Sequence, residues 1–145
     1  LLHDVGKVVL DRFFHRRYAE AARRAAQEPC LIRDAETALF SVHHPEVGRW
    51  LTERWRFPAA IVEPVAFHHR PGGASPDHRA LVAVVHLADI VTRNVGSGSG
   101  GDPRVPLVDA DVYARFDIGP ADIVRWTEEL AEEREAIEAF LQVMH

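Results

Sequence analysis

Apolar residues recur at helical spacing along nearly the whole chain, and this periodicity constrains the fold more than any other feature. Alternation with a period of two, the mark of half-buried strands, is almost absent from the 145 residues. The pattern predicts an all-α fold, a single-domain helical bundle of about six or seven helices. We expect one helix over residues 1–14, a second over 16–28, and later helices that begin at Pro45, at Pro58, near Arg79 and at Pro120. Proline suits a helix start because the first helical position needs no backbone N–H.

The large apolar residues of these helices predict a single core. A chain of this length can bury one. We expect the following residues to contribute to it: Trp50, Trp55, Leu81, Val85 and Trp126.

The stretch NVGSGSGGDPRVP, residues 94–106, predicts a mobile loop, because glycine and serine have little side chain to bury. Too little chain follows it to build a second core, so residues 1–145 are expected to form one domain. The chain opens inside an apolar stripe at Leu1, without an initiator methionine. We therefore expect a fragment of a longer protein, with upstream helices missing.

Composition argues against several classes of protein. The net charge is −5 and no basic patch is evident, which argues against nucleic acid as a partner. No apolar run approaches the roughly 18–20 residues that a membrane span requires, so we expect no membrane association. Cys30 is the single cysteine, which excludes an intrachain disulfide and a cysteine-based zinc site. These features favour a cytoplasmic protein.

A histidine and an acid lie within the opening apolar stripe. Burying an unpaired carboxylate costs several kcal/mol, so Asp4 needs a cation, a metal or strong donors beside it. Histidines and acids also occur at helix ends and on apolar faces further along, and the whole set is His3, Asp4, His44, His68, His69, His86 and Asp89. Imidazole and carboxylate together are ligands for divalent Zn, Mn or Fe. The pattern therefore predicts one metal site where several helices converge.

Nearby residues support this interpretation. His44 occupies the cap position before Pro45, and the pair at 68–69 ends a helix, where the partial negative charge favours a cation. Lys7 lies one turn from Asp4, from where its ammonium group could meet an anion at the rim of the site. Gly6 and Gly48 predict close approach of neighbouring segments.

Each of these residues also has a structural alternative. A lone histidine at a helix terminus is commonly a cap or a hydrogen-bonded core residue. Asp89 could pair with His86 across one helical turn, and Lys7 could bridge Asp4 or Asp11. A structural role alone is expected for four further histidines: His15, His43, His78 and His145.

Four segments, LLHDVGK, HHPEVGRWLTERWRFP, AFHHRP and VHLADIV, resemble in order and spacing the HD superfamily of metal-dependent phosphohydrolases. Within it the chain is most similar to the HDOD domain, the HD-related output domain of bacterial signalling proteins. The resemblance extends over the Gly/Ser-rich loop and the segment DIGPADIVRWTEEL. It implies an HD-domain-like helical bundle that works in bacterial signal transduction, with other signalling domains or proteins as partners.

The resemblance also implies roles for individual residues. The metal ligands would be His3, Asp4, His44, His68, His69 and Asp89, which match the positions used by the HD-GYP branch that cleaves cyclic di-GMP. Asp4 could bridge two ions, and Asp4 and Lys7 would be the catalytic residues. The Gly-Tyr-Pro motif of that branch is replaced here by RPGGASPDHRAL, and its upstream ligand lies before this chain begins.

Three functions remain open at this stage. The first is a signalling module without enzymatic activity that keeps a divalent metal site and acts through regulation or partner binding. The second is an active phosphohydrolase or phosphodiesterase on a nucleotide or cyclic dinucleotide, with one or two Fe, Mn or Zn ions. The third is a structural remnant whose histidines and acids only bond one another. We expect the first, and little or no hydrolysis of cyclic di-GMP.

Overall fold

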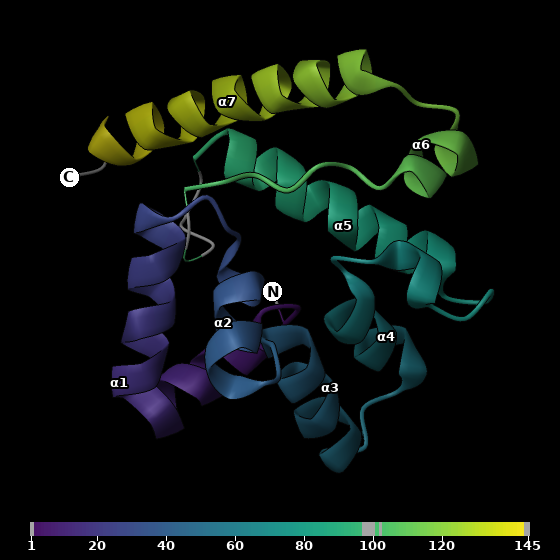
Figure 1. Ribbon diagram of the computed structural model, residues 1–145. Coiled ribbons are helices and arrows are strands. Elements are labelled where there is room, and N and C mark those ends of the chain that lie inside the picture. The colour runs from purple at the N-terminus through teal and green to yellow at the C-terminus, as the bar shows by residue number, and fades with distance from the viewer. Residues whose placement is uncertain (1, 97–100, 102, 144–145) are drawn as a thin grey trace.

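The computed structural model describes residues 2–96, 101 and 103–143. All regular structure in these ranges is helical (Figure 1). The elements are α1 (Val5–Gln27), α2 (Ile32–Phe40), α3 (His44–Arg54), α4 (Ala59–Phe67), the 3₁₀ turn η1 (Pro71–Gly73), α5 (Arg79–Asn94), α6 (Ala110–Phe116) and α7 (Pro120–Val143). The expected all-α fold is confirmed, with seven α-helices in this part of the chain.

Helix α1 joins the two helices that were expected over residues 1–14 and 16–28. Phe14 leaves the helical region, with φ −134° and ψ 37°, and the helix resumes after this kink. Its ring packs edge to face against Phe40 of α2, with centroids 6.0 Å apart. The sequence contains no glycine or proline here, so the chain bends without ending the helix.

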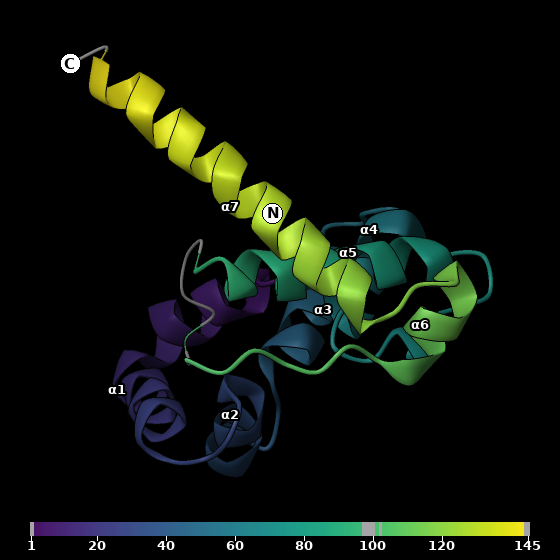
Figure 2. The ribbon, with the colours of Figure 1, turned by 90° about the horizontal axis from the view of Figure 1, so that it is seen from above.

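Helices α1 to α4 form one group, in which α1 packs on α2 and α3, and α3 packs on α4. Helix α5 packs against α4 on one side and α7 on the other, so that it runs through the middle of the molecule (Figure 1). Helix α7 projects beyond the other helices at its C-terminal end (Figure 2). No helix in the described ranges is both long and apolar enough to cross a bilayer.

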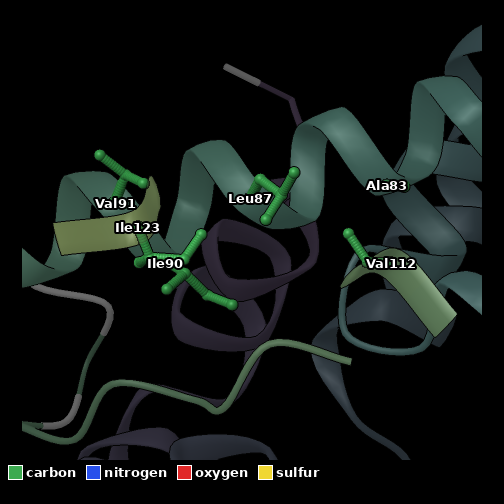
Figure 3. Packing of buried hydrophobic residues seen from close by; sticks show 6 residues of the cluster. All are labelled: Ala83, Leu87, Ile90, Val91, Val112 and Ile123. Atoms are coloured by element: carbon green, nitrogen blue, oxygen red, sulfur yellow. The ribbon is translucent and has the colours of Figure 1, made fainter. Parts of the chain in front are cut away.

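Most of the buried apolar side chains in the described residues fall into two clusters rather than the single core that was expected, and Leu10, Val65, Ala74 and Val82 are buried outside both. One joins α5 to α6 and α7 through Ala83, Leu87, Ile90, Val91, Val112 and Ile123 (Figure 3). The other joins α1 to α2 through Ala21, Ala25, Ile32 and Ala35. The first cluster holds α5, α6 and α7 together, and the second holds α1 and α2 together. The polar residues described below lie on or next to α1 to α5.

The expected core of tryptophans is largely wrong. Trp50 and Trp55 are 54% and 57% exposed, and Leu81 is 42% exposed. Val85 is half-buried, and Trp126 packs against the cluster of α5 to α7. The inward face of α3 is instead formed by Gly48 and Thr52, because α3 approaches its neighbours too closely for an indole.

The predicted mobile loop over residues 94–106 contains residues 97–100 and 102, which lie outside the described ranges. The chain from 103 onward passes beside α5 and leads into α6. The backbone N–H of Asp109 donates to Nε2 of His86, 3.0 Å away, and a guanidinium N–H of Arg93 donates to the carbonyl of Arg104. These bonds tie the segment to α5.

Candidate metal centre

Four side chains from three helices converge beside the start of α1. Asp4 caps α1, and its Oδ1 atom lies 3.2 Å from Nε2 of His44 and 3.6 Å from Nε2 of His68. Nε2 of His44 lies 3.1 Å from Nε2 of His69. One ligand atom from each of these four residues falls within 4.8 Å of the others. The structure thus brings together residues 4, 44, 68 and 69, which are far apart in the sequence.

A close crossing of α1 and α3 makes this convergence possible. A Cβ atom added at Gly6 would lie only 2.0 Å from the carbonyl oxygen of His44. At Gly48 an added Cβ would meet the side chain of Val65 at 2.6 Å. The absence of a side chain lets α1 touch the start of α3 at Gly6 and lets α3 approach α4 at Gly48, which confirms the close approach predicted from the sequence.

Helix α4 delivers the two adjacent histidines from its C-terminal end. His68 caps the helix and is completely buried. Its Nδ1–H is directed at the carbonyls of Val65, 3.0 Å away, and Pro64, 3.2 Å away. With Nδ1 as donor, Nε2 carries the lone pair, and that atom faces Asp4. The helix therefore fixes the tautomer that a metal ligand requires.

Glu36 belongs to this arrangement, although the sequence analysis did not identify it. Glu36 and His44 are both completely buried. Oε2 of Glu36 accepts the backbone N–H of His44 at 2.8 Å and its ring Nδ1–H at 2.7 Å. A sequence signal for Glu36 did exist. Glu36 lies one helical turn after Ile32, on the buried face of α2, and a buried acid needs a specific hydrogen-bond donor.

His3 and Asp89 form a second part of the cluster. Nε2 of His3 lies 3.4 Å from Oδ2 of Asp4 and 3.5 Å from Oδ1 of Asp89. Oδ2 of Asp89 lies 3.9 Å from a guanidinium nitrogen of Arg93. The six predicted ligands are thus linked through Asp4, but His3 and Asp89 stand beside the four-residue group and outside it.

Lys7 lies closer to the centre than expected. Its Nζ donates to Oδ2 of Asp4 at 2.8 Å, and its side chain is 13% exposed. Of the alternatives from the sequence, the structure realises the bridge to Asp4. Asp11 pairs instead with His15 at 2.7 Å, on the exposed side of α1.

His86 does not pair with Asp89 across the helical turn. Its Nδ1–H donates to the carbonyl of His68 at 2.6 Å, and its Nε2 accepts the backbone N–H of Asp109 at 3.0 Å. Both ring nitrogens are satisfied, so His86 is a structural link between α4, α5 and the segment before α6. Nδ1 of His78 lies 2.9 Å from Oε1 of Glu63, and Nδ1 of His43 lies 3.6 Å from Oε2 of Glu46. His145 lies outside the described residues.

Burial and neighbouring charges divide these groups into two kinds. Burial lowers the pKa of His68 and His69, and the charge of Arg33 lowers that of His69 further. Burial alone would raise the pKa of Asp4, but the neighbouring histidines, His3 first, and the charge of Lys7 hold it far below its usual range. Hydrogen bonding to Asp4, and then to Asp89, raises the pKa of His3 to about 9. The carboxylate of Asp4 therefore has a neutral imidazole, that of His68, on one side and a cationic imidazole, that of His3, on the other.

The donor set fits a divalent metal. Oδ1 of Asp4 and Nε2 of His68 are buried and have no hydrogen-bond partner among the described residues. Two acceptors face each other there. Nε2 of His44, whose Nδ1–H is bonded to Glu36, lies 3.2 Å from the same oxygen of Asp4 and 3.1 Å from Nε2 of His69, with which it forms a hydrogen bond. Buried acceptors without donors are costly, and a cation between them removes the cost. One carboxylate and three imidazoles suit Zn, Mn or Fe.

The comparisons agree with the resemblance in the first half of the chain. Residues 1–71 match the family model of the HDOD domain. This range contains Asp4, His44, His68 and His69, whereas Asp89 lies beyond it. An uncharacterized protein of Treponema pallidum (strain Nichols) is 26% identical over 93 residues, which is 64% of this chain. The aligned part is 18% of that protein, so the chain spans less than a fifth of this relative. No solved structure matches the chain.

Proposed function

We propose that this chain is an HDOD-type module of bacterial signal transduction that holds a divalent metal ion and acts through regulation or partner binding in the cytoplasm. Its partners would be other signalling domains or proteins. The match of residues 1–71 to the HDOD domain supports the class of module. The four-residue group supports the metal.

The observation that carries the proposal is the direction of the lone pairs. Glu36 accepts a hydrogen bond from the ring Nδ1–H of His44, and backbone carbonyls accept one from the ring Nδ1–H of His68. Both rings therefore turn an unprotonated nitrogen toward the same oxygen of Asp4. A structural remnant would place a proton between such groups, so this geometry favours a metal ligand set over a set of mutual hydrogen bonds.

The residues of the site would have different roles toward the metal ion. Asp4, His44, His68 and His69 would hold the ion, and His3 and Asp89 would extend the site on the side of α5. Glu36 would orient His44, and the carbonyls at the end of α4 would orient His68. A bound divalent ion supplies Lewis acidity and lowers the pKa of a bound water. In a regulatory module the same ion joins α1, α3 and α4, so its occupancy changes how firmly they are held together.

A second candidate function is hydrolysis of a phosphoester in a nucleotide or cyclic dinucleotide. The position of Lys7 favours it, because an ammonium group 2.8 Å from Asp4 can also stabilise charge on a phosphoryl oxygen at the same site. Asp4 and Lys7 would then be the catalytic residues. The chain lacks the Gly-Tyr-Pro motif of the branch that cleaves cyclic di-GMP, so we rank this function second.

The test is a titration of metal-stripped protein with Mn²⁺ and Zn²⁺, followed by calorimetry. We expect saturable binding to the wild type and its loss in Asp4→Asn. Asp11→Asn is the matched control, because Asp11 lies on the same helix, is exposed, and pairs only with His15 among the contacts described. Thermal unfolding of both variants checks that each is folded. Equal binding by Asp4→Asn and wild type, or no binding at all, contradicts the proposal.

Hydrolysis of bis(p-nitrophenyl) phosphate by the metal-loaded protein separates the two functions. The regulatory proposal expects no turnover above that of the free ion. Turnover that disappears in Lys7→Met while metal binding is retained would establish the second function instead. Lys7→Met keeps an unbranched side chain of nearly the same length and removes the ammonium group, with its charge and its hydrogen bond to Asp4.

A further inference from the structure

A cavity of 440 Å³ opens beside the metal centre, between α2, α3 and the end of α4. His69 lines it and is the one member of the four-residue group that does so. Three arginines also line it, Arg33, Arg49 and Arg70, while Pro45 and Phe67 supply apolar wall. Three guanidinium groups around one cavity are notable in a chain whose net charge is −5.

The two acids that line the cavity, Asp34 and Glu46, also cap helices. A carboxylate oxygen of Asp34 accepts the backbone N–H of Leu31 at 3.2 Å, where it caps α2. A carboxylate oxygen of Glu46 accepts the backbone N–H of His43 at 3.3 Å, where it caps α3. These bonds draw both carboxylates toward helix ends, so the two carboxylates neutralise the positive charge of the arginines only in part.

The arginines differ in how far they are neutralised. Arg49 forms an ion pair with Glu53 at 2.8 Å on the outer face of α3. Arg33 lies 3.7 Å from Asp34. Arg70 forms no ion pair with any described residue. It directly follows His69 in the sequence, and both residues line the cavity. The side of the cavity toward His69 therefore carries positive charge that the protein does not fully compensate.

We propose that this cavity binds a small organic anion, a phosphate ester or a carboxylate, with its charged group on Arg33 and Arg70 and its body against Phe67. Guanidinium groups recognise both anions through paired N–H donors. The volume lies within the range of ligand sites in proteins, about 300–1,000 Å³. This inference deepens the proposed function, because it gives the metal-binding module a ligand. It rests on the proposed function only where it treats the cavity and the metal centre as parts of one site.

The space for the body of the ligand continues beyond this cavity. A second cavity of 600 Å³ shares Arg49, Ala66 and Phe67 with the first and runs between α3 and α4 toward Ser75. An anion held near His69 could extend its organic part along this groove. The ring of Phe67 lies at the junction, where it would contact a flat apolar group.

The experiment measures binding of phenyl phosphate, benzoate and phenol by calorimetry, each with EDTA and again with Zn²⁺. We expect saturable binding of at least one anion and none of phenol. Arg33→Gln and Arg70→Gln should each weaken it by about tenfold or more, since hydrogen bonds to charged groups contribute about 1.5–3 kcal/mol. Arg54→Gln is the control, because Arg54 is exposed on α3 and does not line the cavity.

The two anions distinguish the ligand class, since tighter binding of phenyl phosphate assigns a phosphate and tighter binding of benzoate a carboxylate. Anion binding in EDTA that depends on the two arginines supports this inference even if no metal binds, in which case only the proposed function fails. Absence of binding by both anions overturns it. Equal binding of phenol, or binding unchanged in both arginine variants, overturns it as well.

Discussion

Replacing Gly6 with alanine tests the helix crossing on which the candidate centre depends. The added methyl group would lie 2.0 Å from the carbonyl oxygen of His44 and 2.9 Å from the backbone nitrogen of Gly48. An ordinary Cβ contact begins at 3.4 Å, so the two backbones must separate by about 1.4 Å. No flexible side chain can move aside to relieve this contact. Overpacking usually costs about 1–3 kcal/mol, and we expect about 3 kcal/mol or more here, because the obstacle is backbone.

Urea unfolding followed by circular dichroism measures this loss. Gly72→Ala is the control, since a Cβ atom there would be 3.7 Å from its nearest neighbour, a carboxylate oxygen of Asp111. That variant should be unchanged or stabilised by up to about 1 kcal/mol. Since the displaced group belongs to His44, metal binding by Gly6→Ala should weaken as well. A Gly6→Ala protein with wild-type stability and wild-type metal affinity would refute the reasoning.

Three further outcomes are expected. Glu36→Gln should weaken metal binding by about 10- to 100-fold in the same titration, because the amide no longer fixes the ring proton of His44; an affinity within about twofold of wild type would contradict this. Burial would raise the pKa of Glu63, but hydrogen bonds from Ser75 hold it below 4.5, so its contribution to stability is complete above that value and lost on further acidification. The free energy of unfolding of Glu63→Gln should therefore fall less than that of wild type between about pH 6 and about pH 3. Ile32→Ala should cost about 2–5 kcal/mol, and Trp50→Ala clearly less, because Ile32 is 1% exposed and Trp50 54%.

The helices were predictable because their signals are local. Apolar spacing identified the all-α class, and the prolines at 45, 58 and 120 marked the starts of α3, α4 and α7 to within a residue. The core was less predictable, since apolar size does not tell which face of a helix has room. Two glycines bring α1 and α3 together, and this contact leaves Trp50 on the outer surface.

The candidate site was also predictable only in part. Residue chemistry was enough to select Asp4 and the histidines at helix ends, whose role as ligands stays a prediction. Their partners depend on contacts between distant segments, such as the bond of His44 to Glu36. The two bonds of His86, to the carbonyl of His68 and the N–H of Asp109, are equally nonlocal. A helical pattern can place an acid on a buried face, but it cannot say which donor will meet it.

The most direct test of the central claim is anomalous X-ray diffraction from crystals of the zinc-loaded protein, with data collected on both sides of the zinc absorption edge. The account predicts an anomalous peak within bonding distance of Oδ1 of Asp4 and of the Nε2 atoms of His44 and His68. A crystal that shows no peak there, or one in which the zinc lies at an unrelated pair such as Glu63 and His78, would contradict the metal centre proposed for this chain.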